Sequence, residues 1–314
     1  MATRSEGPVR PKARRMVAAL FAALALFAIG AASAEAKYAA IVIDAETGRV
    51  LHNVNADTRN YPASLAKMMT LYLFFEAIED GRLALDHHLN VSSLSARQPA
   101  SRLGLKKGQS ITVERAILAL VTKSANDVAA VVAEALAGSQ RDFALKMTAT
   151  ARRLGMSRTT FRNPSGLPHR GQLSTARDMA TLARSLIRDF PQYYHYFSAR
   201  SFSYGGRDHL NHNKLLNTYD GADGIKTGYI RASGFNLVAS ARRGERRLIG
   251  VIFGGKSPGA RNRLMAKLLD KGFNILNGTA PARKKAVRRT AKKIPRTRPS
   301  TARPSTTELW AIQV

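Results

Sequence analysis

The chain contains 314 residues, 45% of them hydrophobic, with no cysteine and a formal net charge of +29. This length allows one or two domains with a sizeable core, and the apolar content excludes low-complexity and collagen-like chains. The absence of cysteine excludes a disulfide scaffold, a thiolate zinc site, an iron–sulfur cluster and a cysteine nucleophile.

The amino terminus has the pattern of an export signal. Residues 1–34 contain five basic residues and one acid, and an apolar run over 16–30 follows the basic residues. Two candidate A-x-A cleavage sites lie between Ala32 and Ala36. The run is shorter than the roughly 20 apolar residues of a membrane-spanning helix. We therefore expect a signal peptide over 1–34 rather than a membrane anchor, and export argues against nucleic acid as a partner.

The hydrophobic pattern then predicts strands, helices and strands again. Residues 38–44 have the apolar character of a buried strand, and 49–52 are predicted as the returning strand of a hairpin. Segments 235–241 and 248–253 are also β-rich. Apolar residues with a helical period predict helices at 64–78, 112–121, 127–136, 142–154, 175–187 and 260–276. Strands at both ends with helices between them predict one mixed α/β domain over 37–280.

The composition changes after this domain. Residues 281–304 contain ten basic residues and no acid, and they have few large apolar side chains. Such a segment cannot bury enough surface to offset the entropy lost on ordering. We expect a disordered basic linker that associates with an anionic wall polymer or an anionic membrane surface.

Three short motifs each occur once along the predicted domain. They are Ser64-x-x-Lys67, Ser124-x-Asn126 and the run at 226–228, Lys-Thr-Gly. Each pattern alone is weak because short patterns of common residues arise by chance. Their ordered combination is specific, since a closely similar trio marks serine acyl-transfer enzymes.

The first motif places a candidate nucleophile beside a candidate base. Ser64 lies at the start of a predicted helix, and Lys67 shares its face three residues later. A serine hydroxyl needs a base, whereas an ordinary Lys, with a pKa of about 10.4, is protonated at pH 7. Burial, a helix N-terminus and a second cation such as Lys226 would lower that pKa. We interpret Lys67 as a partly neutral general base; the alternative is a solvated pair on a surface helix.

The second motif lies in the predicted turn between two helices. Ser124 could relay a proton between Lys67 and the leaving amine, and Asn126 could hydrogen-bond a substrate amide. The alternative is an ordinary cap for the helix that starts near Asp127, because Ser and Asn both favour that position.

The third motif supplies candidate binding groups. Lys226 would attract a substrate carboxylate with help from the Thr227 hydroxyl, and Gly228 would let a substrate backbone approach closely. The backbone N–H groups of Ser64 and Tyr229 are candidates for an oxyanion hole. The alternative is a β-turn with an exposed lysine.

On these motifs the chain resembles the serine-type D-alanyl-D-alanine carboxypeptidases, the low-molecular-mass penicillin-binding proteins. The resemblance extends over most of 37–280 and rests on YPASLAKMMT (61–70), SANDVA (124–129), STARDMA (174–180), DGIKTG (223–228) and FNLVASA (235–241). It implies a β-lactamase/DD-peptidase-like α+β fold. In that fold an antiparallel sheet from both chain ends is flanked by helices, with a helical subdomain.

The resemblance also implies an activity and residue roles. Pentapeptide stems of peptidoglycan would acylate Ser64 and lose their terminal D-alanine, and β-lactams would acylate it stably, with no metal or organic cofactor. Matched by position, Lys67 becomes the proton acceptor and Ser124 an active-site residue. Lys226 becomes a substrate-binding residue, and Arg261 resembles an arginine that helps to hold the terminal carboxylate. Residues 305–314 resemble the start of a truncated SPOR-type peptidoglycan-binding domain.

Other functions share some of these features. A DD-endopeptidase would carry every motif. A class A β-lactamase uses S-D-N and a deacylating Glu, whereas here Ala125 replaces the Asp and no Glu lies between Met156 and Lys226. A non-catalytic wall-binding protein would act through the basic segment 281–304 instead.

Two further patterns do not support a site. Residues 250–257 match a phosphate-binding loop, but the predicted strand leaves too little loop between strand and helix. The histidines have no metal-ligand spacing, so we interpret them as surface or core residues; those considered are His87, His88, His209 and His212.

Overall fold

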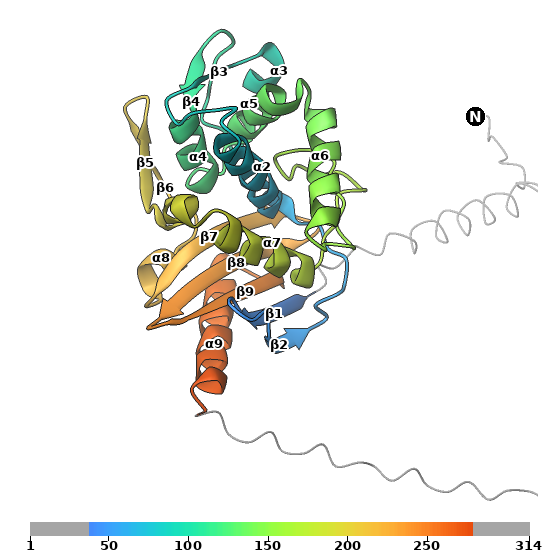
Figure 1. The fold of residues 1–314 in the computed structure, drawn as a ribbon, viewed down its shortest axis with the longest axis vertical. Coiled ribbons are helices and arrows are strands. Elements are labelled where there is room, and N and C mark those ends of the chain that lie inside the picture. Colours follow the sequence, from blue (N-terminus) through green and yellow to red (C-terminus); the bar gives the residue numbers. More distant parts are fainter. Residues whose placement is uncertain (1–37, 279–314) are drawn as a thin grey trace, which may run out of the picture. The chain divides into compact units, whose positions relative to one another are not determined.

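The structure is a computed structural model that describes residues 38–278 (Figure 1). The signal peptide predicted over 1–34, the linker over 281–304 and the segment 305–314 lie outside the described residues. Within 38–278, no helix combines the length and the apolar character needed to span a membrane.

A five-stranded antiparallel sheet is built from both ends of the described chain, in the order β2-β1-β9-β8-β7. Its strands are β1 Ala39–Asp44, β2 Val50–Val54, β7 Ala222–Ile230, β8 Gly234–Arg243 and β9 Arg246–Gly255. The predicted strands and the amino-terminal hairpin are thus confirmed. The sequence alone did not decide whether the segment of β7 is a strand or a turn, because its central Lys-Thr-Gly run has little β propensity.

Strands β1, β8 and β9 are buried on both faces over most of their length, which explains their nearly continuous apolar runs, whereas the edge strand β2 is partly exposed. In β1, Ala40 and Val42 pack in the same core as Leu269 of α9, Pro258–Leu276. The intervening Ile41 and Ile43 belong to the second core, which extends under the other helices. Figure 1 shows α9 against one face of the sheet and α7 across the other.

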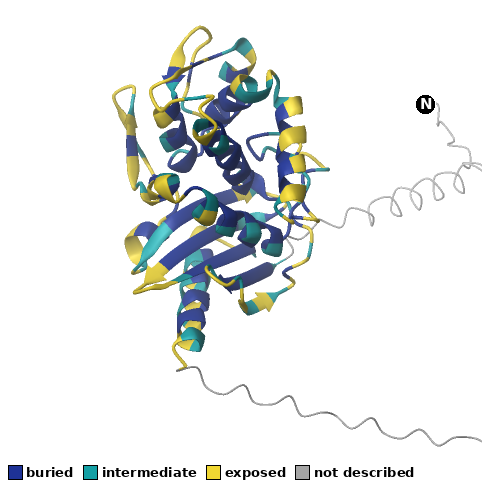
Figure 2. Ribbon diagram, in the orientation of Figure 1, coloured by how far each residue is buried: buried dark blue, intermediate teal, exposed yellow. Residues whose placement is uncertain are grey.

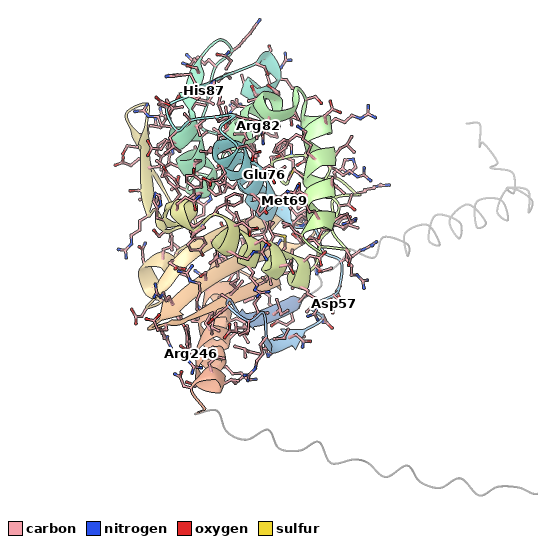
Figure 3. The ribbon with its side chains drawn as sticks, viewed as in Figure 1. Asp57, Met69, Glu76, Arg82, His87 and Arg246 are labelled. Atoms are coloured by element: carbon pink, nitrogen blue, oxygen red, sulfur yellow. The ribbon has the colours of Figure 1, made fainter. Side chains whose placement is uncertain are left out.

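The segment between the strands of the sheet is mostly helical, as predicted. Its helices are η1 Ala63–Ala66, α2 Lys67–Glu79, α3 Ser93–Ala96, α4 Val113–Val121, α5 Asn126–Ala137, α6 Gln140–Arg153, α7 Ala176–Asp189, η2 Pro191–Ser198 and α8 Leu215–Thr218. Most side chains of α2 are buried, and Met69 lies inside the helical region, whereas Arg82 and His87 lie at its surface (Figures 2 and 3).

Side-chain caps set several of the predicted helix starts. Thr175 Oγ1 accepts a hydrogen bond from the Asp178 backbone N–H at 3.0 Å, so α7 begins where the sequence predicted. Thr112 and Ser139 cap α4 and α6 in the same way.

Two short antiparallel strand pairs are absent from the sequence prediction. They are β3 His88–Asn90 with β4 Ser110–Thr112, and β5 Ser201–Tyr204 with β6 Arg207–Leu210. Strands of three or four residues are too short for an alternating pattern to be recognised. As predicted, 250–255 continue strand β9 rather than forming a phosphate-binding loop.

Candidate active site

Ser64 lies in a tight turn held between the sheet and the central helix. The preceding Ala63 has a left-handed φ of 50°, and η1 then continues directly into α2. From β8, Asn236 Nδ2 donates to the Tyr61 carbonyl at 3.2 Å. Arg261 Nη1 in turn donates to the Asn236 carbonyl at 3.0 Å. The predicted single helix over 64–78 therefore begins as a 3₁₀ turn whose position the sheet determines.

Lys67 is the first residue of α2 and is fully buried. Its Nζ lies 3.3 Å from Ser64 Oγ, 2.7 Å from Asn126 Oδ1 and 2.5 Å from the Ser165 carbonyl oxygen. Burial lowers the pKa of Lys67 well below its usual value, and the charge of Lys226 lowers it further. The alternative of a solvated pair on a surface helix is wrong.

The Ser124–Asn126 turn faces Lys67 from α5. Ala125 occupies the N-cap position of α5, and no side chain caps the helix there, so the capping alternative is wrong. Ser124 has a φ of 59°, and its buried Oγ has no hydrogen-bond partner among the described residues. The Asn126 side chain bridges Lys67 and the Pro99 carbonyl, to which its Nδ2 donates at 2.9 Å.

Lys226 and Thr227 lie on β7, at one edge of the sheet. Lys226 is 1% exposed, which excludes the exposed β-turn. Burial, with the neighbouring Arg261 charge, lowers the pKa of Lys226 to about 7. Burial also lowers the pKa of Arg261 to about 10, so this guanidinium stays charged at pH 7. An added Cβ at Gly228 would lie 3.1 Å from Ser64 N, so this strand packs closely against the Ser64 turn, and the substrate approach predicted at Gly228 stays a prediction.

These elements enclose a pocket of about 500 Å³. The predicted site residues that line it are Ser64, Ser124, Asn126, Thr227, Gly228, Tyr229 and Arg261. Lys67 and Lys226 do not line the pocket, since both are buried. Lys67 contacts Ser64, which does line it. Stretches distant in the sequence thus bring Ser64, Ser124 and Arg261 to the wall of one cavity, while Lys67 and Lys226 are buried beside Ser64 and Thr227.

Sequence reasoning missed part of the pocket wall. His212 and the segment 165–168 line the pocket, as do Ala100 and Ser101. The segments carry no motif, and His212 was interpreted only as a surface or core histidine. No pattern within these stretches could have indicated that they reach Ser64. Among residues 38–278, no group of three or more His, Asp or Glu side chains is arranged to hold a metal ion.

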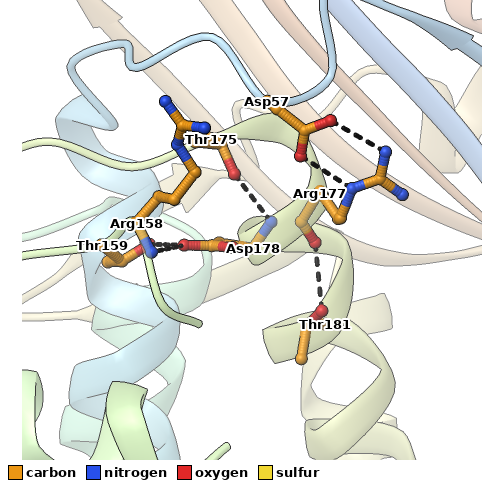
Figure 4. A network of polar contacts seen from close by, with 7 residues as sticks. All are labelled: Asp57, Arg158, Thr159, Thr175, Arg177, Asp178 and Thr181. Atoms are coloured by element: carbon orange, nitrogen blue, oxygen red, sulfur yellow. Dashed lines mark hydrogen bonds and ion pairs between the residues drawn. The ribbon is translucent and has the colours of Figure 1, made fainter. Parts of the chain in front are cut away.

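The loop that carries Ser165 is held by buried polar contacts. Gln172 Oε1 accepts from the backbone N–H groups of Arg162 and Asn163, at 3.0 and 3.1 Å. Farther along, Asp178 Oδ2 accepts from the Thr159 hydroxyl at 2.6 Å, in the network that joins this loop to α7 (Figure 4). The position of the Ser165 carbonyl beside Lys67 is thus fixed from both ends of the loop.

Gly166 provides a test of this packing. Its φ is 87°, and an added Cβ would lie 1.9 Å from the Ala63 carbonyl oxygen. We expect Gly166→Ala to lower the free energy of unfolding by at least about 3 kcal/mol, because the backbone of either Gly166 or Ala63 must move. Gly138→Ala is the matched control: its φ is 73°, but the space is open. Its cost is therefore about 1 kcal/mol. Equal costs in urea unfolding would contradict the proposed contact.

Comparison with known proteins identifies the family. The profile for D-alanyl-D-alanine carboxypeptidases matches residues 27–257. The chain belongs to the D-alanyl-D-alanine carboxypeptidase family. DacF of Bacillus subtilis is 36% identical over 251 residues, covering 76% of this chain and 62% of that protein. DacA of Escherichia coli is 36% identical over 250 residues, covering 77% and 62%. The chain therefore spans about three fifths of the length of these curated carboxypeptidases.

Solved structures share the fold. Penicillin-binding protein 5 from Haemophilus influenzae has a TM-score of 0.73 and 32% identity, covering 75% of this chain and 70% of that one. Penicillin-binding protein D2 from Listeria monocytogenes, bound to ampicillin, has a TM-score of 0.69 and 32% identity, covering 75% and 96%. The predicted fold class, an antiparallel sheet with flanking helices of the DD-peptidase type, is confirmed.

Proposed function

We propose that this chain is an exported serine carboxypeptidase that removes the terminal D-alanine from peptidoglycan pentapeptide stems. The observation that carries the proposal is the contact between Ser64 Oγ and a buried Lys67 amine at 3.3 Å. Membership of the carboxypeptidase family supports the reaction class. The roles assigned below to individual residues are part of the proposal.

The contacts of Lys67 favour its action as a base. The two shorter contacts, to Asn126 Oδ1 and the Ser165 carbonyl, are with atoms that only accept hydrogen bonds. A neutral amine has two N–H bonds, and both are directed to these acceptors. Its lone pair then points toward Ser64 Oγ, the one contact that can donate a proton. Burial and the charge of Lys226 lower the pKa of Lys67, which makes this neutral form more accessible than it is for an ordinary lysine.

In the proposed acylation, Ser64 gains the acyl group, and its proton ends on the D-alanine that leaves. Ser64 Oγ attacks the carbonyl carbon of the penultimate D-alanine while its proton passes to Lys67 Nζ. The backbone N–H groups of Ser64 and Tyr229 would stabilise the oxyanion. The C–N bond breaks, and Lys67 returns the proton to the leaving D-alanine nitrogen through the Ser124 hydroxyl. This relay is supported by the otherwise unpartnered Ser124 Oγ in the pocket wall. Water then hydrolyses the acyl-enzyme.

The buried cations account for recognition of a free carboxyl terminus. Arg261 lines the pocket, and Lys226 is buried next to Thr227, whose hydroxyl would also contact the carboxylate. A substrate carboxylate would compensate two charges that the protein leaves without a carboxylate partner among the described residues. Asn126 would hydrogen-bond the substrate amide with the remaining hydrogen on Nδ2.

β-Lactams are expected to acylate the same serine and to leave slowly. One relative, penicillin-binding protein D2 from Listeria monocytogenes, has been solved both with ampicillin and with cefotaxime bound. The pocket lining includes no carboxylate that would activate water against a β-lactam acyl-enzyme. This feature favours a penicillin-binding carboxypeptidase over a β-lactamase.

The signal pattern over 1–34 supports export to the periplasm or cell envelope, where peptidoglycan lies. The basic segment 281–304 would bind an anionic wall polymer or membrane surface, with residues 37–280 as the catalytic domain and 305–314 as the start of a second wall-binding module. Neither terminal segment lies within the described residues.

Peptide hydrolysis tests the proposed function. We expect the purified chain to release D-alanine from a synthetic stem pentapeptide, measured with D-amino acid oxidase, and to act more slowly on a cross-linked stem dimer. The two cations Lys226 and Arg261 favour a substrate with a free carboxyl terminus, so the pentapeptide should be cleaved faster than the dimer. Faster cleavage of the dimer would instead identify an endopeptidase. Absence of both activities, with wall binding retained, would identify a non-catalytic protein.

A further inference from the structure

A second hollow adjoins the catalytic pocket. It has a volume of about 300 Å³ and shares Pro168 and Ile230 with that pocket. Its other lining residues are Tyr61, His169, Arg170 and Ala232. The two cavities therefore lie next to each other at the end of β7, between the β7–β8 turn and the loop after Ser165.

The direction of β7 relates this hollow to an extended substrate. Under the proposed function, on which this inference rests, the terminal carboxylate lies near Lys226 and Thr227. Ile230 is three residues farther along the strand, which corresponds to about 10 Å. An extended peptide along this edge would place its third residue from the carboxyl end near Ile230, two residues upstream of the D-alanine that leaves. The side chain of that third residue would enter the hollow.

The hollow combines an apolar wall with unpaired positive charge. Ile230, Pro168 and the ring of Tyr61 can contact methylene groups. Arg170 is exposed and forms no hydrogen bond or ion pair with any residue in 38–278. His169 Nδ1 accepts a hydrogen bond from the Gly171 N–H at 3.0 Å, so the ring proton is on Nε2 as a donor. No carboxylate lines the hollow.

The loop that carries these donors is held in place. The Gln172 backbone N–H donates to the His169 carbonyl at 3.0 Å, and the buried Gln172 side chain donates to the Leu167 carbonyl at 3.1 Å. Donors on a fixed loop lose less entropy when they bind a ligand.

We propose that this hollow selects stem peptides whose third residue from the carboxyl end has a side chain ending in a carboxylate, and that Arg170 is its main specificity determinant. The methylene groups would contact Ile230 and Pro168, and the carboxylate would accept from Arg170 and His169. A side chain ending in an ammonium group would meet the like charge of Arg170 and would find no carboxylate in the hollow.

Three synthetic peptides test the proposal. They are Nα-acetyl-X-D-Ala-D-Ala, with X as α-aminoadipate, its δ-carboxamide, or lysine. We expect kcat/KM for D-alanine release to be about fivefold to tenfold higher for the carboxylate than for the carboxamide. Lysine should be lowest. The difference should lie mainly in KM, because these contacts are remote from the reacting carbonyl.

Variants distinguish a specific contact with Arg170 from a general effect of the protein's positive charge. Arg170→Gln should bring the ratio of carboxylate to carboxamide close to one, and Arg170→Lys should keep part of it. Arg141→Gln removes the same charge at an exposed position of α6 and should keep the full ratio. A ratio near one in the wild type, or one that Arg141→Gln lowers as much as Arg170→Gln, would overturn this inference alone. Failure to cleave any of the peptides would overturn the proposed function as well.

Discussion

Replacing Lys67 with arginine is expected to slow the acylation of Ser64 about 10³-fold at pH 7. A guanidinium remains protonated at any accessible pH and cannot accept the serine proton. General base catalysis contributes about 10²–10⁴-fold when the base is correctly placed. The measurement is the rate of covalent labelling by a fluorescent penicillin, followed in parallel with D-alanine release.

A second variant of Lys67 and a control variant at another lysine complete this test. Arginine is larger than lysine and could disturb the buried site, so Lys67→Met tests the same loss with a side chain suited to burial. Its stability is checked by urea unfolding, because it removes a desolvated amine but also takes a hydrogen-bond donor from Asn126 Oδ1 and the Ser165 carbonyl. Lys267→Arg, on the exposed side of α9, should label at the normal rate. A stable Lys67→Met variant with normal labelling would contradict the role of Lys67 as base.

The pH dependence of acylation follows from the same groups. As the pH falls through the lowered pKa of Lys67, the amine becomes protonated and acylation should slow. As the pH rises above about 7, Lys226 loses the charge that attracts the substrate carboxylate, so kcat/KM should fall on that side too. We expect a bell-shaped profile for the wild type, whose acidic limb is missing in Lys67→Met because that variant has no amine to protonate. An unchanged acidic limb in Lys67→Met would assign it to another group.

The sequence predicted the order of the main elements and the pairing of Ser64 with Lys67, because both depend on local spacing. An i, i+3 pair at a helix start lies on one face whatever surrounds it. Strands β1, β8 and β9 were predictable for a similar reason, since a strand buried on both faces has an apolar run that is visible in the sequence.

Other parts of the site depend on contacts between distant segments. The burial of Lys226 results from the packing of β7 against β8, η1 and η2, and nothing in Lys-Thr-Gly distinguishes it from an exposed turn. The Ser165 carbonyl acts through its backbone, so any residue type could supply it. The role of Gly166 likewise appears only when Ala63 is packed against it. Sequence motifs therefore indicated which side chains matter, and the fold determined their protonation and surroundings.

Covalent labelling of Ser64 tests the central claim most directly. The wild type, incubated with a fluorescent penicillin, should give one labelled band on a denaturing gel, and mass spectrometry should locate the adduct on the peptide that contains Ser64. Ser64→Ala should give no band, whereas Ser201→Ala, at an exposed position of β5, should label normally. Equal labelling of Ser64→Ala and the wild type, or an adduct on a different residue, would contradict the assignment of Ser64 as the nucleophile.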